Sequence, residues 1–239
     1  MTAIASLDYG LVAFIDILGF SSMVEEDSKG KTPKFLPIFL EVFEEVAGSA
    51  AGSGCDVKMF SDSIIVEAEL TPSNVVGLLG IAASMQKLFL KRNILVRGGI
   101  AFGKHFSNER VTFSQALINA YHLESKVAKF PRIVINDDVL NFAWHHIDAN
   151  EGIRDGVRAL VFRDRDNSAF VHYFMGEELN DLKPFVRDYI ESNASSHETV
   201  LEKMRWLLDY YNYCANHSGG ERLAIRSLER DFSNLDIIN

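Results

Sequence analysis

The feature that most constrains this sequence is a carboxylate inside an apolar run. Asp16 interrupts the apolar residues between Ala13 and Leu18, and Gly19 follows directly. Such a run predicts a strand buried on both faces, which we place at residues 10–18. An ionised aspartate there is costly unless a metal, an arginine or several N–H donors compensate it. The simpler alternative is an aspartate that caps the turn after the strand.

Composition and charge limit the classes of protein to consider. The 239 residues are enough for one large domain, or for a compact domain with an appendage. A hydrophobic content of 47% with 24% charged residues is typical of a soluble globular protein, and no apolar run of about 20 residues predicts membrane insertion. A net charge of −9 argues against a nucleic-acid partner. Two distant cysteines and the lack of a secretory signal favour a cytoplasmic location.

Apolar periodicity and turn residues predict a βαββαβ order in the first part of the chain. This order fits a ferredoxin-like α+β sandwich, an antiparallel sheet with helices on one face. We expect the polar residues 25–32 to form a loop. The predicted elements are a strand at 10–18, a helix at 35–46, a hairpin at 57–69 with Asp62 at its tip, a helix at 72–92, a strand at 94–106, a helix at 114–127 and a strand at 132–135.

The pattern changes after residue 136 and becomes mostly helical. We predict a helix at 139–147 and a hairpin that joins 160–163 to 169–174. Ser195 and Glu198 have the spacing of a capping box before a further helix, and a last helix is expected at 222–232. We therefore divide the chain into a domain at 1–175 and a helical C-terminal extension at 176–239, which packs on the core or on a dimer.

The topology brings two carboxylates together. In a βαββαβ sheet the end of the first strand neighbours the tip of the next hairpin, so Asp16 and Asp62 should face each other. Two close carboxylates repel unless a hard cation neutralises them, and Mg²⁺ or Mn²⁺ bound to a nucleoside triphosphate does so. The loop from Ile17 to Ser21 offers backbone N–H groups and a glycine beside this position. The arrangement suits two-metal phosphoryl or nucleotidyl transfer.

Five blocks carry a family resemblance. The stretch from Phe14 to Ser21 resembles the motif F-x-D-I-x-G-F-[ST] of class III nucleotidyl cyclases, and 58–63 resembles their second metal motif with serine in place of glycine. The stretch 97–103 resembles R-x-G-I-x-x-G. The stretches 114–124 and 132–135 resemble the family's helix motif and the strand that supplies a phosphate-binding cation. The resemblance covers 12–136, in the family's order.

The resemblance implies a catalytic domain at 1–175 with two Mg²⁺ or Mn²⁺ ions per active site. The 3′-hydroxyl of the ribose would attack the α-phosphorus in line, and pyrophosphate would leave. The residues that the motifs assign are Asp16, Asp62 and the Ile17 carbonyl as metal ligands; Gly19 and Phe20 beside the phosphates; Arg132 for the triphosphate; Arg97 for developing negative charge; Lys58 for the base; and His122 as the donor that stands in place of the family's arginine.

One subgroup of the family is more similar than the rest. The helix segment Ala120-Tyr121-His122-Leu123-Glu124 is similar to that of the pyrimidine cyclases of bacterial Pycsar anti-phage systems. This resemblance implies cyclisation of UTP or CTP, with UTP favoured, and a product that a separate effector reads. It also implies a head-to-tail homodimer with active sites between the protomers. The alternatives are an adenylate cyclase, which Lys58 permits, and a catalytically silent domain that regulates a partner.

Overall fold

One long strand occupies the middle of the sheet. Strand β1 (Asp8–Ile17) pairs antiparallel with β3 (Ser63–Glu69) on one side and with β4 (Val96–Ser107) on the other. Its side chains from Leu11 to Ala13, and that of Ile15, are fully buried. The prediction of a strand buried on both faces is therefore confirmed, with boundaries shifted by two residues at the start.

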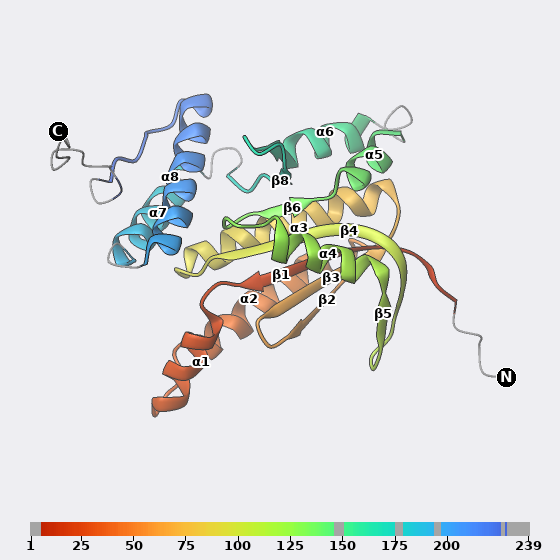
Figure 1. Ribbon diagram of the computed structural model, residues 1–239, viewed down its shortest axis with the longest axis horizontal. Helices are drawn as coiled ribbons and strands as arrows, with labels where there is room; N and C mark the ends of the chain where they lie inside the picture. The colour runs from red at the N-terminus through yellow and green to blue at the C-terminus, as the bar shows by residue number, and fades with distance from the viewer. Residues whose placement is uncertain (1–5, 146–150, 175–178, 194–196, 226–227, 229–239) are drawn as a thin grey trace, which may run out of the picture.

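The computed structural model describes residues 6–145, 151–174, 179–193, 197–225 and 228. Figure 1 shows the arrangement of their elements around the sheet. Besides β1, β3 and β4, these are α1 (Phe20–Lys29), α2 (Phe35–Ala50), β2 (Cys55–Phe60), α3 (Pro72–Lys91), β5 (Thr112–Ser114), α4 (Gln115–Lys126), β6 (Ile133–Ile135), α5 (Asp137–His145), α6 (Glu151–Leu160), β7 (Val161–Arg163), β8 (Ala169–Val171), α7 (Leu179–Ser192) and α8 (Glu198–Ser218).

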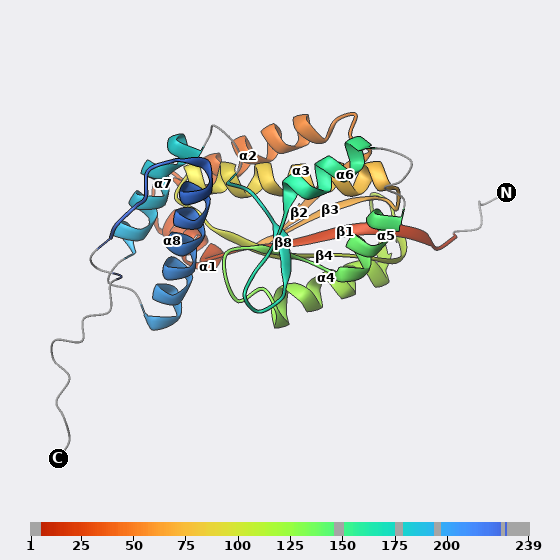
Figure 2. The ribbon, with the colours of Figure 1, turned by 90° about the horizontal axis from the view of Figure 1, so that it is seen from above.

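The strand order of the sheet is β2-β3-β1-β4-β6-β8-β7, and β5 pairs with the end of β4. The first four strands have the ferredoxin-like order, so the predicted α+β core is confirmed. Strands β4 and β6 are parallel, whereas the other pairs are antiparallel. The prediction that helices cover one face is wrong, because α2 and α3 lie on one side of the sheet and α4 on the other (Figure 2).

Close packing holds α4 against the second face of the sheet. A small cluster of Val12, Ala101, Ala116 and Ala120 forms this contact. A Cβ atom at Gly99 of β4 would lie 2.3 Å from the carbonyl oxygen of Ala120, so only a glycine admits the helix at this distance. The α4 helix begins where the Ser114 hydroxyl accepts a hydrogen bond from the Leu117 N–H at 2.9 Å, as the sequence predicts.

The C-terminal helix α8 packs on the far strands of the sheet. Its Trp206 ring stacks on Phe130 at 5.8 Å and donates a hydrogen bond from Nε1 to Asp164 Oδ2 at 2.7 Å. One turn later, the buried Tyr210 hydroxyl accepts a hydrogen bond from the Tyr173 N–H at 3.0 Å and lies 2.6 Å from His172 Nδ1. This part of the C-terminal extension therefore packs on the core.

Several local predictions differ from the structure. Residues 25–32 were expected to form a loop, but most of them belong to α1, which has no buried residue and hence no apolar stripe to reveal it. The short strand β5 and helix α6 have no counterpart among the predicted elements. Residues 222–225 of the last predicted helix are irregular, and the rest of it lies outside the described residues, as do Ser195 and the end of the helix predicted at 139–147.

Helix α3 has the length and composition of a membrane-spanning segment, with a mean hydropathy of 1.3 over its most apolar window. The expectation that no apolar stretch is long enough to span a membrane is therefore wrong as far as length and composition go. Small residues separate the apolar side chains of α3, so the sequence shows no continuous apolar run. Its buried side chains include Leu78, Leu79 and Phe89, which belong to the main core of the domain. Burial in this core explains the apolar composition of α3 without a membrane.

The tight contact at Gly99 gives a first prediction. We expect Gly99→Ala to lower the free energy of unfolding by about 1–3 kcal/mol or more, because the added Cβ displaces α4 from the sheet. Gly80→Ala is the matched control: its Cβ would meet nothing within 4 Å on α3, so alanine should stabilise by up to about 1 kcal/mol. Urea denaturation measures both. Equal stability of the Gly99→Ala variant and the wild type would contradict the close approach.

The buried His172 predicts how stability depends on pH. Burial lowers the pKa of His172 from 6.5 to about 4. The unfolded chain therefore takes up a proton at higher pH than the folded one, and stability falls as the pH falls from about 6.5 toward 4, by about 3 kcal/mol in total. In His172→Gln this loss should be reduced. Thermal melts of both proteins between pH 7 and 4 test it; parallel curves would mean that His172 does not titrate on unfolding.

Candidate functional site

The structure brings Asp16 and Asp62 to the same end of the sheet. Asp16 lies near the end of β1, opposite Ser63 of β3. Asp62 occupies the turn between β2 and β3, and its carbonyl oxygen accepts a hydrogen bond from the Ile17 N–H at 3.0 Å. This backbone bond joins the end of β1 to the hairpin tip. The neighbouring carboxylates that the topology predicts are therefore present in the fold.

Arg97 connects this pair to helix α4. Its Nε lies 3.1 Å from Asp16 Oδ2, and its Nη2 lies 2.6 Å from Glu124 Oε1. The Glu124 side chain is only 4% exposed. Burial raises the pKa of Glu124, the positive charge of Arg97 opposes this, and the charges of Asp16 and Asp62 add to it. Three carboxylates thus act on one another around a single guanidinium.

Glu124 is a residue of this site to which the sequence reasoning gave no role. It belongs to the helix motif, but the motif alone did not say which way the side chain points. Ala116, Ala120 and Glu124 follow one another at four-residue spacing and are all buried. An acidic residue that continues an apolar helix face is the sequence signal that marks it, since a buried carboxylate needs a charged partner.

The oxygen atoms at this end of the sheet fit a hard divalent cation. The Asp16 side chain is partly exposed, and Asp62 is half-buried and accepts one long hydrogen bond, at 3.5 Å from the Ser63 hydroxyl. Carboxylate and carbonyl oxygens are the ligands that Mg²⁺ and Mn²⁺ prefer. Among the described residues, no group of three or more His, Cys, Asp or Glu side chains is arranged to hold a metal. A metal here would therefore depend on the two aspartates, backbone carbonyls and the substrate.

The chain turns sharply after the two aspartates and starts a helix. Gly19 has a φ of 82°, a left-handed conformation that favours glycine, and forms the N-cap of α1. Its carbonyl accepts hydrogen bonds from the N–H groups of Ser22 and Met23. Phe20 packs its ring 5.5 Å from Phe39 and so fixes the first turn on the core. The first N–H groups of such a helix lack partners within the helix and can bind an anion.

Lys58 lies in a polar cluster on the same side of the sheet as α4. Its Nζ contacts Glu67 and Asp56 and lies 2.9 Å from the Ser107 hydroxyl. Burial alone would lower the pKa of Lys58, but the hydrogen bonds and charges of Glu67 and Asp56 outweigh burial and raise it. In the folded chain, the buried carboxylate that pairs with Lys58 is therefore that of Glu67.

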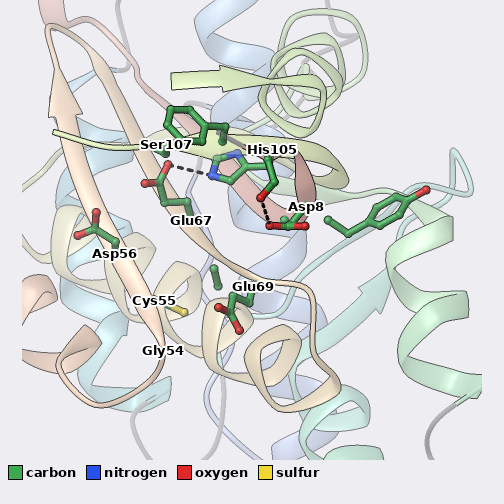
Figure 3. A pocket seen from close by; sticks show the side chains of 13 residues that line it. Asp8, Gly54, Cys55, Asp56, Glu67, Glu69, His105 and Ser107 are labelled. Atoms are coloured by element: carbon green, nitrogen blue, oxygen red, sulfur yellow. Dashed lines mark hydrogen bonds and ion pairs between the residues drawn. The ribbon is translucent and has the colours of Figure 1, made fainter. Parts of the chain in front are cut away.

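Glu67 itself borders an open hollow of about 800 Å³ beside the first residues of β1 (Figure 3). In Figure 3 its carboxylate points toward His105, with Oε2 3.6 Å from Nε2. Glu67 is buried, and its Oε2 makes no hydrogen bond with the described residues. The strand pairing places Lys58 level with Phe14, which is two residues before Asp16 on β1. The ammonium group of Lys58 is bound to Glu67, away from Asp16. Within one chain, Lys58 and Asp16 are not brought into contact.

Arg132, which the resemblance assigns to the triphosphate, is already paired with carboxylates of its own chain. Its side chain is fully buried, and its guanidinium contacts the carboxylates of Asp164 and Asp166 in the β7–β8 turn. Rings of Phe130 and Trp206 lie beside it at 5.4 and 5.9 Å. Binding of a triphosphate by Arg132 would require both ion pairs to open, so in this fold the residue anchors the turn.

Two further residues bear on the candidate site, His122 of α4 and Lys203 of α8. His122 is exposed on α4, with its ring 6.0 Å from that of Tyr121, and its role as a donor remains a prediction. Lys203 of α8 is a residue that sequence reasoning missed. Burial and the positive charge of Arg97 lower the pKa of Lys203, whereas the negative charge of Asp16 opposes this. A lysine from the C-terminal extension therefore lies within electrostatic reach of the Asp16 site.

Comparison with solved structures identifies the fold. The guanylyl cyclase domain of the RhoGC fusion protein from the aquatic fungus Blastocladiella emersonii matches with a TM-score of 0.52, covering 70% of this chain and 98% of that domain. The catalytic core of a rhodopsin-guanylyl cyclase with converted specificity, in complex with ATPαS, matches with a TM-score of 0.50 over 70% and 97%. The chain has the fold of a nucleotidyl cyclase catalytic domain. Both proteins are 14% identical to it.

The cyclase fold agrees with the resemblance that the motifs indicate. No family model matches the chain, and no curated protein does. At 14% identity the two solved cyclases establish the fold and leave the reaction and the base open. Any inference about the reaction must therefore rest on the side chains at the end of β1.

Proposed function

We propose that this chain is a pyrimidine nucleotide cyclase, which converts UTP, or CTP, to the 3′,5′-cyclic nucleotide and pyrophosphate. The observation that carries the proposal is the pair Asp16 and Asp62 at one end of β1, partly exposed and next to the N-terminus of α1, in a cyclase fold. The resemblance to Pycsar cyclases favours UTP and a messenger role in antiviral defence, in which a separate effector reads the product.

The residues of this end suit an in-line displacement. Asp16, Asp62 and the Ile17 carbonyl would hold two Mg²⁺ or Mn²⁺ ions, which supply positive charge for the attacking and leaving oxygens. The ribose 3′-hydroxyl would give its proton to solvent water, and its oxygen would bond to the α-phosphorus. The bond from that phosphorus to the bridging oxygen of pyrophosphate would break, and pyrophosphate would leave with the electron pair of that bond. The N–H groups that follow Gly19 bind phosphate oxygens. Arg97, oriented by Glu124, offers its guanidinium to charge that develops on the α-phosphate.

Lys58 and Glu67 form a pair that suits recognition of a base. An ammonium donates hydrogen bonds and a carboxylate accepts them, so together they match an acceptor beside a donor. Uracil presents O4 beside N3–H, and cytosine presents N3 beside its amino group. Adenine presents a similar pair, which keeps an adenylate cyclase as the alternative to test. Glu67 Oε2 accepts no hydrogen bond from the described residues and has His105 Nε2 beside it at 3.6 Å, which supports a role as an acceptor in recognition.

A homodimer would bring these two parts together. Within one chain the Lys58 cluster does not contact the Asp16 site, so a second protomer would supply one of them. Large apolar side chains are exposed at the end of β2, on β5 and on α4, where Phe60 is 81%, Phe113 68% and Ile118 55% exposed. Exposed patches of this kind mark interaction surfaces. Their place supports the head-to-tail dimer that the resemblance implies.

The competing function is a silent domain that binds nucleotide and regulates a partner. The family's asparagine and arginine positions are occupied by Ile118 and His122, which favours it. Asp16 and Asp62 are both retained and reach solvent, which opposes it. A domain that only bound a partner would not need two carboxylates beside each other at the end of a buried strand.

Incubation with each of the four nucleoside triphosphates and Mn²⁺ tests the proposal. We expect cyclic UMP, or cyclic CMP, as the main product, with a loss of more than about 100-fold in Asp62→Ala because a metal ligand is removed. Asp188→Ala, an exposed position on α7, is the control and should keep wild-type activity. Cyclic AMP as the main product would exclude the pyrimidine assignment. No cyclic product from any triphosphate would favour the silent domain.

Mixing two inactive variants tests the shared site. Asp62→Ala removes a metal ligand, and Lys58→Ala removes the base contact. If each site combines Asp62 of one protomer with Lys58 of the other, half of the randomly mixed dimers contain one intact site of two. The mixture should then regain about one quarter of wild-type activity. A mixture as inactive as its components would mean that both residues serve the site from the same chain.

A further inference from the structure

Helix α8 crosses the end of the sheet at which Asp16 lies. Figures 1 and 2 both show α8 on the side of the molecule toward which the arrowhead of β1 points. Trp206 of α8 lies against Arg132 and Phe130. The Arg132 carbonyl accepts a hydrogen bond from the Gly98 N–H at 3.1 Å, directly beside Arg97. These contacts fix α8 next to the residues that hold Asp16.

Lys203 is a residue of α8 whose charge interacts with this end of the sheet. It precedes Trp206 by three residues, so both side chains lie on the same side of the helix. Met204 and Leu207, on the neighbouring side, are fully buried. Lys203 is half-buried, and both Arg97 and Asp16 act on its charge. The packing of α8 therefore brings the ammonium of Lys203 within electrostatic reach of Arg97 and Asp16.

Lys203 differs from the neighbouring cations Arg97 and Arg132 because it has no carboxylate partner among the described residues. Arg97 is bound to Asp16 and Glu124, and Arg132 to Asp164 and Asp166. Within the described part of the chain, Lys203 makes neither an ion pair nor a hydrogen bond. A partly buried ammonium without a partner is costly, and an anionic ligand would remove that cost. A phosphate group is such a ligand.

We propose that Lys203 binds the β- and γ-phosphates of the nucleoside triphosphate, so that the C-terminal extension completes the active site. The proposal rests on the proposed function and takes the place of the role expected for Arg132. The β- and γ-phosphates would lie at Lys203, with the α-phosphorus at Asp16 and Asp62. Lys203 is then a substrate-binding residue, and its ammonium also offsets the charge of the leaving pyrophosphate.

Binding of inorganic triphosphate in the presence of Mg²⁺, measured by calorimetry, tests this without any need for catalysis. We expect Lys203→Met to bind it about 10- to 100-fold more weakly than the wild type, the range for loss of a charged hydrogen bond. Lys203→Arg should recover most of the affinity. Arg205→Ala is the matched control, because it removes one positive charge from the same helix but from a residue paired with Glu198 at 2.6 Å.

The results separate this proposal from the proposed function. Equal affinity of Lys203→Met and wild type, or an equal loss in Arg205→Ala, would overturn the role of Lys203, as would a wild-type protein that does not bind triphosphate. If no cyclic product forms but triphosphate binding still depends on Lys203, the phosphate site stands and the cyclase activity does not. In an active enzyme, Lys203→Met should raise the KM for the nucleotide about 10-fold or more, with a matching rise in the inhibition constant of pyrophosphate. Thermal melts establish that each variant is folded.

Discussion

One arginine connects the three parts that meet at the functional end of the sheet. Arg97 stands on β4 and contacts Asp16 of β1 and Glu124 of α4, so a single guanidinium links strand, helix and site. Without its charge, burial and the negative charges of Asp16 and Asp62 would raise the pKa of Glu124 with nothing to oppose them. Gly99, two residues further along β4, admits α4 at the distance that this contact needs. The ion pair between Arg97 and Glu124 and the close packing at Gly99 thus hold α4 in the same position on the sheet.

The sequence predicts the central features of the fold because local patterns encode them. The apolar run around Asp16 predicts a strand buried on both faces, and β1 is such a strand. Turn residues predict the hairpin that carries Asp62, and the order of elements then predicts that the two aspartates meet. By contrast, α1 has no buried residue, so its helix leaves no periodic apolar signal and was interpreted as a loop.

The partners of the charged residues are harder to predict, because they come from distant parts of the chain. Lys58 meets Ser107 only because β4 bends toward β5, and Arg132 meets Asp166 through a turn of the β7–β8 hairpin. Burial of Arg132 and the half-buried position of Lys203 on α8 follow from how the helices pack on the sheet, and no spacing within the sequence expresses that packing. The motifs predict a site at the end of the sheet that carries Asp16 and Asp62, but they do not predict which cations there lack a carboxylate partner.

The order of the elements along the chain adds a consequence for how such a protein comes into being. Asp16 belongs to the first strand and Lys203 to the last described helix, yet both lie at the same end of the sheet. During synthesis the strands from β1 to β8 leave the ribosome before α8 does. Because buried side chains of α8 such as Met204 and Tyr210 belong to the main core, that core and the proposed phosphate side are completed together, only when α8 packs on the sheet.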